Sequence, residues 1–185
     1  TSPDAIHYIL EHYPTTKWYR DTEGNTLLHH AVTTANPAIF HKLLEAYPQA
    51  AKIPNRLGLL PLHAALWKCC VEDVSILEAL LHVYPQAASI HDQSGYAPLH
   101  YACQEGVSDA TIIDLLLDLL PQHTSKQILE QPVWDGSVCL HLALKQASHP
   151  SATADVSSQV IFKLLERDPA AAHRPDPTSH LFPLH

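Results

Sequence analysis

Histidine is the residue type of this chain with the greatest capacity for chemistry: 15 of the 185 residues are histidines, and four more are cysteines. Imidazole and thiolate groups coordinate zinc and serve in nucleophilic catalysis. Both uses need groups at characteristic spacings, such as two histidines one helical turn apart. The pairs His29–His30 and Cys139–His141 lack that spacing. His100 and Cys103 are three residues apart, and a small cysteine packed in a core accounts for that pair.

The four cysteines are Cys69, Cys70, Cys103 and Cys139. All lie in apolar segments without C-x-x-C spacing, so the sequence indicates neither a disulfide framework nor a zinc ribbon. We expect them to fill space in an intracellular, cytoplasmic protein, and other intracellular compartments stay open.

Motifs of the common enzyme classes are missing from the sequence. It contains no Gly-x-Ser-x-Gly, no Gly-rich phosphate loop and no His-Glu-x-x-His. We therefore predict that the chain is not an enzyme and binds neither a cofactor nor a metal ion. A histidine-based metalloprotein remains as an alternative, which stoichiometric zinc would support.

The charge balance narrows the classes of partner. The chain has 11 Lys and Arg against 19 Asp and Glu, which gives a formal net charge of −8. No cluster of basic residues offsets this negative charge locally. Such a chain repels phosphate backbones, so we expect neither nucleic acid nor anionic membrane surfaces as partners. No apolar run reaches the roughly 18 residues of a transmembrane helix, so we expect no membrane insertion.

Internal repeats explain the large number of histidines. A Leu-His pair recurs in one frame, ending at residues 29, 63, 100, 141 and 185. In the first four copies a Gly stands five residues before the His and an Ala two residues after it. The repeated positions are His29, His63, His100 and His141, with Gly24, Gly58, Gly95 and Gly136. We interpret these residues as a structural motif.

A second element alternates with the first. Two large apolar residues, usually a Leu-Leu pair, are followed four residues later by Pro, in the segments 9–14, 43–48, 80–85, 116–121 and 164–169. The spacing from one repeat His to the next grows from 34 to 37, 41 and 44 residues. Each unit is predicted to be a glycine turn and two helices, because the apolar residues recur at i, i+3 and i+4 and Pro stands at helix boundaries.

These motifs resemble the ankyrin repeat family, whose pattern is a turn Gly, then Thr-Pro-Leu-His-x-Ala, then a Leu-Leu pair. The stretches 24–31 and 95–102 match best. The resemblance implies an all-α solenoid of stacked helix-turn-helix units with short hairpin loops, four full repeats plus partial ones at both ends. We expect a single array over 1–185, with a partial repeat 1–20, repeats 21–54, 55–91, 92–131 and 132–175, and a partial repeat 176–185.

The chain departs from the family pattern at several points. Only Thr26 keeps the Thr of the motif, and Leu60, Ala97 and Val138 replace it, so the hydroxyl that bridges to the His is lost there. Insertions at 122–131 and 148–158 are expected to enlarge two loops, and the sequence leaves their role open. Neither end carries a polar cap, and Met is absent, so we expect that further repeats or a partner cover both ends.

The resemblance implies that hairpin tips and first helices line a concave groove. Residues at these positions form the predicted partner-binding set: Arg56, Trp67, Lys68, Tyr101, Gln104, Glu105, Trp134, Asp135 and Lys145. Trp67, Tyr101 and Trp134 are the expected anchors, because aromatic residues dominate interface hot spots. The competing interpretation of Trp67 is packing between repeats. Trp18 and Tyr19 form a second aromatic edge.

These observations predict a non-catalytic protein–protein interaction module or scaffold, whose protein partner the sequence does not name. Two alternatives stay open. The chain could be a structural ankyrin subunit embedded in a larger assembly, or a regulatory repeat segment of a larger enzyme.

Overall fold

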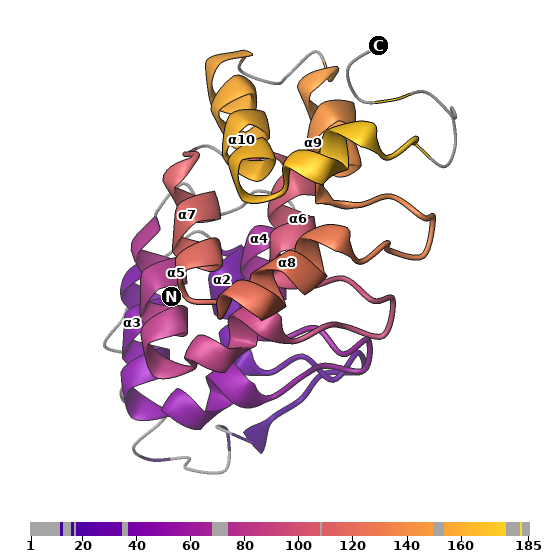
Figure 1. Cartoon of the computed structure of the whole chain (residues 1–185). Helices are drawn as coiled ribbons and strands as arrows, with labels where there is room; N and C mark the ends of the chain where they lie inside the picture. The colour runs from indigo at the N-terminus through magenta and orange to yellow at the C-terminus, as the bar shows by residue number, and fades with distance from the viewer. Residues whose placement is uncertain are drawn as a thin grey trace. The chain divides into compact units, whose positions relative to one another are not determined.

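A computed structural model of the chain describes residues 12, 16, 18–34, 37–67, 74–107, 109–149, 154–176 and 182. Within these residues all regular elements are helices, in agreement with the predicted all-α class (Figure 1). None of the described helices is long and apolar enough to cross a membrane. The chain divides into two compact units, Thr1–Ala87 and Ala88–His185. The prediction of one continuous array therefore stays a prediction.

The first unit contains two helix pairs. Helix α2 (Leu27–Thr33) packs on α3 (Pro37–Ala46), and α4 (Pro61–Leu66) packs on α5 (Val74–Val83). The pairs also pack on each other, through α2 with α4 and α3 with α5. The core between them consists of fully buried apolar side chains, among them Leu28, Phe40, Leu62, Leu77 and Leu80. Each of these contributes about 2 kcal/mol through removal of its surface from water.

The second unit repeats this plan. Helix α6 (Pro98–Glu105) packs on α7 (Thr111–Asp118), and α9 (Cys139–Ala147) packs on α10 (Ala154–Arg167). Contacts of α6 with α9 and of α7 with α10 join the two pairs. Buried Leu99, Ile113, Leu116 and Leu164 belong to its core. At the surface, Lys163 and Arg167 on α10 form ion pairs with acidic residues of α7, namely Asp114 and Asp118.

Prolines mark the helix boundaries as predicted. Pro61 and Pro98 are the first residues of α4 and α6, where a missing N–H costs nothing. The Pro-Gln-Ala-Ala stretches at 48–51 and 85–88 form short 3₁₀ helices, η2 (Pro48–Lys52) and η3 (Pro85–Ser89), and Pro169 starts the related η4 (Pro169–His173). Their alanines at 50, 51, 87, 88 and 171 are buried, so these turns belong to the core.

The expectation that residues 122–131 enlarge a loop is wrong. Gln122–Glu130 is an α-helix, α8, at the repeat position where the other repeats have a 3₁₀ helix. Ser125, Ile128 and Leu129 are buried, a spacing that gives the helix one inward face, and α8 packs on α9.

The second expected loop, 148–158, is shorter than predicted. Helix α10 begins at Ala154, because Val160 and Leu164, one helical turn apart, anchor it in the core. Residues 150–153 lie outside the described part of the chain.

Candidate functional site

Four glycine turns are the most regular feature of the hairpins. Gly24, Gly58, Gly95 and Gly136 have φ angles of 81°, 80°, 82° and 82°, the region that favours glycine. In each turn the glycine N–H donates to the carbonyl three residues earlier, over 2.8–3.2 Å. The same earlier residue donates its own N–H to the carbonyl just after the glycine, over 2.9–3.1 Å. The four glycines therefore occupy positive-φ positions in turns of one kind.

A side-chain cap fastens three of these turns, and the sequence analysis missed it. Three residues before the glycine stand Asp21, Asn55 and Asp92. The Oδ1 atom of each accepts two backbone N–H groups across the turn, at 2.8–3.0 Å. Asp and Asn at one fixed distance from the turn glycine were a signal that could have revealed this cap.

Asp21 shows the electrostatic effect of the cap. Desolvation raises the pKa of its carboxyl, but hydrogen bonds from Asn25, Glu23 and His30 outweigh that effect and lower the pKa to about 2. The carboxylate is therefore ionised at neutral pH, and it ties the turn to the first residue beyond the repeat histidine.

The repeat histidines form hydrogen bonds with backbone groups. The Thr26 N–H donates to His29 Nδ1 over 3.1 Å, and His29 Nε2–H donates to the Leu59 carbonyl over 2.9 Å. His100 and His141 use Nδ1 in the same way, and their Nε2 groups donate to the carbonyls of Gln131 and Arg174. His63 Nδ1 accepts the Leu60 N–H over 3.0 Å. In His29, His100 and His141 both ring nitrogens are therefore occupied by backbone groups.

Loss of the motif threonine does not remove this cap. The Thr26 hydroxyl lies 2.9 Å from His29 Nδ1, as the resemblance implied. Where Leu60, Ala97 and Val138 replace it, the backbone N–H of the same residue still donates to the histidine.

Burial keeps two of these rings neutral. It lowers the pKa of His29 and lowers that of His100 to about 4, although the hydrogen bonds of both rings to carbonyl groups act in the opposite direction.

The remaining histidines were expected at the surface, and most of them lie there: 12, 41, 82, 123, 149 and 173 are exposed. His91 is an exception, since its ring is half-buried 6.4 Å from that of His100 and its Nε2 atom has no hydrogen-bond partner within the described residues. Residues 7 and 180 lie outside the described part. Among the described residues no three His, Cys, Asp or Glu side chains gather as a metal site would require.

Tyr101 was expected to be an exposed anchor, and this is wrong. Its side chain is 9% exposed, and its hydroxyl donates to Asp92 Oδ2 over 2.6 Å. Burial and the Asp92 carboxylate both raise the pKa of this hydroxyl. The residue therefore holds the hairpin to α6.

His30, the corresponding residue of the first unit, makes the same bond to Asp21 Oδ2 over 2.9 Å. In the last hairpin the pair is replaced by two buried apolar residues, Val133 and Leu142.

The two cysteines in the described part of the chain are buried, free thiols. Cys103 on α6 and Cys139 on α9 are 1% and 0% exposed. Burial, and a hydrogen bond with Cys103, raise the pKa of the Cys139 thiol, so Cys139 lacks the thiolate character of a nucleophile. Cys69 and Cys70 lie outside the described residues.

In the first unit the hairpins and first helices enclose a hollow of about 360 Å³. Its walls include Glu23 and Leu57 from two hairpins, and His30, Ala64 and Trp67 from α2 and α4 and their ends. Trp67 is 39% exposed and Leu57 53%. The structure thus places the predicted anchor Trp67 at a concave surface. Arg56 is exposed on the same hairpin as Leu57, and Lys68 lies outside the described residues.

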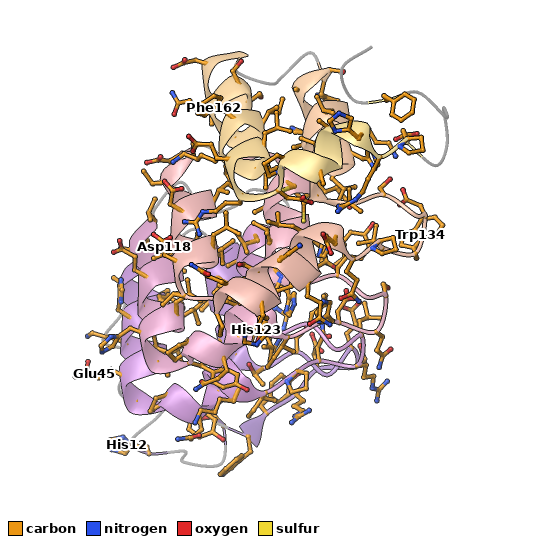
Figure 2. The ribbon with its side chains drawn as sticks, in the orientation of Figure 1. His12, Glu45, Asp118, His123, Trp134 and Phe162 are labelled. Atoms are coloured by element: carbon orange, nitrogen blue, oxygen red, sulfur yellow. The ribbon has the colours of Figure 1, made fainter. Side chains whose placement is uncertain are left out.

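In the second unit Trp134 projects from the tip of the last hairpin and is 78% exposed (Figure 2). Its neighbour Asp135 lies 3.6 Å from Lys145 Nζ, which also donates to the Ser137 hydroxyl over 3.0 Å. Three predicted residues therefore meet around one hairpin.

Two other predicted residues, Gln104 and Glu105, lie at the end of α6. Gln104 is exposed, and its amide donates to the half-buried Glu105 carboxylate over 3.5 Å. Trp18 and Tyr19 are 63% and 56% exposed, and the ring of Trp18 packs edge-on against Tyr47.

Glycine hairpins, paired helices and histidines 29, 100 and 141, whose Nε2 groups donate to carbonyls some 30 residues further along the same compact unit, define a class of helical repeat protein. Comparison with solved structures identifies the fold as that of ankyrin repeats. The chain is similar to the ankyrin repeat domain of Bcl-3, described as a unique member of the IkappaB protein family, with 20% sequence identity and a TM-score of 0.66. The match covers 98% of this chain and 71% of the other. No family model matches the sequence, and no curated protein does.

The likeness to the Bcl-3 domain concerns the fold. The particular function of this chain has to come from its own surface residues.

Proposed function

We propose that this chain is a non-catalytic protein-interaction module that presents its hairpin tips and first helices to a protein partner. The observation that carries the proposal is the position of Trp67 and Trp134. Each is a large, partly or mostly exposed apolar side chain of its own compact unit, and each stands beside a hairpin held by backbone and side-chain hydrogen bonds. Exposed tryptophans are the residues most enriched in interface hot spots.

The rigidity of the hairpins supports the proposal. In the first unit the Arg56 N–H donates to the Glu23 carbonyl over 2.9 Å, and the Asn55 amide donates to Asn25 Oδ1 over 2.8 Å. Two successive hairpins are thereby tied together. A surface already ordered before binding loses little conformational entropy when a partner arrives.

Affinity capture from cells followed by mass spectrometry tests this assignment. We expect Trp67→Ala and Trp134→Ala each to reduce recovery of the same partner severalfold. Phe162→Ala is the matched control, because Phe162 is also a large exposed aromatic (63%) but stands on α10, a second helix. Unchanged recovery with both tryptophan variants, confirmed as folded by circular dichroism, would contradict the proposed surface.

Two alternative functions give different results in the same experiment. A structural subunit of a larger assembly would aggregate when purified alone, and its recovery would depend on Phe162 as much as on the tryptophans. A regulatory segment of an enzyme would recover a catalytic domain of its own full-length chain. An intracellular, cytoplasmic location and a single array over 1–185 belong to the same proposal.

A further inference from the structure

The hollow of the first unit has a chemical character that narrows the kind of partner. It lies within one unit, between the hairpins around Gly24 and Gly58 and the helices α2 and α4. Its volume of about 360 Å³ is at the lower end of the range of roughly 300–1,000 Å³ for small-ligand pockets. A space of this size receives a large side chain of a partner more readily than a whole cofactor.

The charges around the hollow favour a cation. Among the described residues that line it, Glu23 is the one carboxylate, and there is no Lys or Arg. The Asp21 carboxylate lies behind the wall, 2.9 Å from His30 Nε2. Arg20 and Arg56 belong to the same hairpins but are not among the lining residues: Arg20 is directed to the Pro54 carbonyl, 3.4 Å away.

Three donor side chains of the hollow already have hydrogen-bond partners. The Asn25 amide donates to Asp21 Oδ2 and to Glu23 Oε2, over 3.0 and 3.2 Å. The Asn55 amide donates to Asn25, and the Thr33 hydroxyl donates to the His30 carbonyl. The strongest acceptor among the described lining residues is the carboxylate of Glu23. A donor-rich group therefore fits, whereas an anion would meet a like charge.

The apolar wall selects among cations. Trp67 offers an indole face, and Leu57 and Ala64 offer aliphatic surface beside it. Arginine combines a hydrocarbon stem with a planar guanidinium that stacks on aromatic rings and binds carboxylates through two parallel hydrogen bonds. We propose that this hollow receives an arginine side chain of the protein partner, with the guanidinium stacked on Trp67 and paired with Glu23.

This inference rests on the proposed function, and a direct binding experiment separates the two. The ¹⁵N-labelled full chain is titrated at pH 7.5 with the peptide acetyl-Gly-Ser-Arg-Ser-Gly-amide and with versions carrying citrulline, Lys or Glu in place of Arg. Citrulline is the matched probe, since it keeps the shape of arginine and lacks its charge. The indole N–H signals of Trp67 and Trp134 report on the two regions independently.

We expect the arginine peptide to shift the Trp67 signal and to leave that of Trp134 unchanged. Citrulline should bind roughly tenfold more weakly, lysine should be intermediate, and the Glu peptide should not bind. Glu23→Gln should abolish the preference for arginine over citrulline. This variant is isosteric and lies at an exposed turn, so it retains the fold. Glu45→Gln serves as its charge control, because Glu45 is an exposed carboxylate on α3 that does not line the hollow.

Several results would overturn the inference: equal shifts with arginine and citrulline, binding of the Glu peptide, an unchanged preference in Glu23→Gln, or no shift at Trp67 up to the solubility limit of the peptides. If arginine selectivity is absent while cellular capture depends on Trp67, the proposed function stands and this inference fails. If selectivity is present while capture ignores both tryptophans, the proposed surface is wrong and the arginine site stands.

Discussion

Trp67 and Trp134 illustrate two ways in which one repeat architecture presents an aromatic residue. Trp67 follows α4 and forms a wall of a hollow, together with Glu23 and Leu57. Trp134 stands at a hairpin tip and is twice as exposed, 78% against 39%. A recess constrains both the shape and the charge of what enters it, whereas a projecting ring supplies apolar contact area and leaves shape to the partner. We therefore expect selectivity from the first unit and adaptable contact from the second.

The hairpins next to these two tryptophans differ in the side chains that hold their turns. In the first unit polar side chains hold the turn, with Asp21 bonded to His30 and Asn55 to Asn25. At the last hairpin the corresponding residues are Val133 and Leu142, and both are buried. The side chain that caps this turn is Asp135, which lies inside the turn and accepts the Ser137 N–H over 2.8 Å. The same pair of repeat positions is therefore polar in some repeats and apolar in the last hairpin, and the backbone turn is the same in both cases.

The largest expected effect comes from removing the histidine beneath the hollow. His29→Ala leaves a buried space and deprives the Leu59 carbonyl and the Thr26 N–H of a partner. We expect a loss of about 2–4 kcal/mol in the free energy of unfolding, measured by urea denaturation. The hollow should lose arginine binding while the Trp134 indole signal stays in place. A shift of both signals would show that the two regions are not independent.

Acid should act on the second unit through His100. Its pKa is lowered from 6.5 to about 4 in the folded chain, so the folded state binds fewer protons than the unfolded state in that interval. The stabilisation from the neutral ring is complete above pH 6.5 and is lost as the pH falls from 6.5 to 4, by about 3 kcal/mol in total. Unfolding free energies measured from pH 7.5 to 4 should show this loss, and His100→Gln should have a flatter profile. Equal profiles would contradict the assignment.

Two turn glycines offer a matched comparison between the units. Gly24 and Gly95 have φ angles of 81° and 82°, so alanine at either site costs about 1 kcal/mol in backbone strain. A Cβ at Gly24 would also lie 3.0 Å from the Arg56 nitrogen, whereas nothing lies within 4 Å at Gly95. Gly24→Ala should therefore lower the melting temperature more than Gly95→Ala. The reverse order would show that the contact between the first two hairpins is unimportant.

The smallest expected loss of stability comes from removing the hydrogen bond between the hairpin and the residue that follows the repeat histidine. Tyr101→Phe removes a 2.6 Å hydrogen bond to Asp92 in a mostly buried setting, and we expect a loss of about 1 kcal/mol by urea denaturation. His30→Ala removes the equivalent bond to Asp21, but its ring is 51% exposed, so the loss should be smaller. A larger loss for His30→Ala would mean that the hollow depends on this bond for its shape.

Much of the fold was predictable because the repeat applies the same local rules several times. A positive-φ position requires glycine, a helix start tolerates proline, and apolar residues one turn apart must be buried. Helix α8 escaped prediction because its inward face consists of only Ser125, Ile128 and Leu129 within an otherwise polar segment. So weak a pattern does not predict a helix by itself. The helix is stabilised by packing against α9, which the sequence pattern does not show.

The candidate site was predictable in composition but not in geometry. The sequence by itself determined the repeating unit, the recurrence of its histidines at one position and the lack of catalytic motifs, since all of these follow from residue types at fixed spacings. Only the tertiary structure decided that Tyr101 is buried, that Trp134 projects, and that Trp67 meets Glu23 and Leu57 around one hollow. The hollow combines Glu23 and Trp67, which lie far apart along the chain, so no local spacing brings them together and only the packing of successive repeats places them around one space.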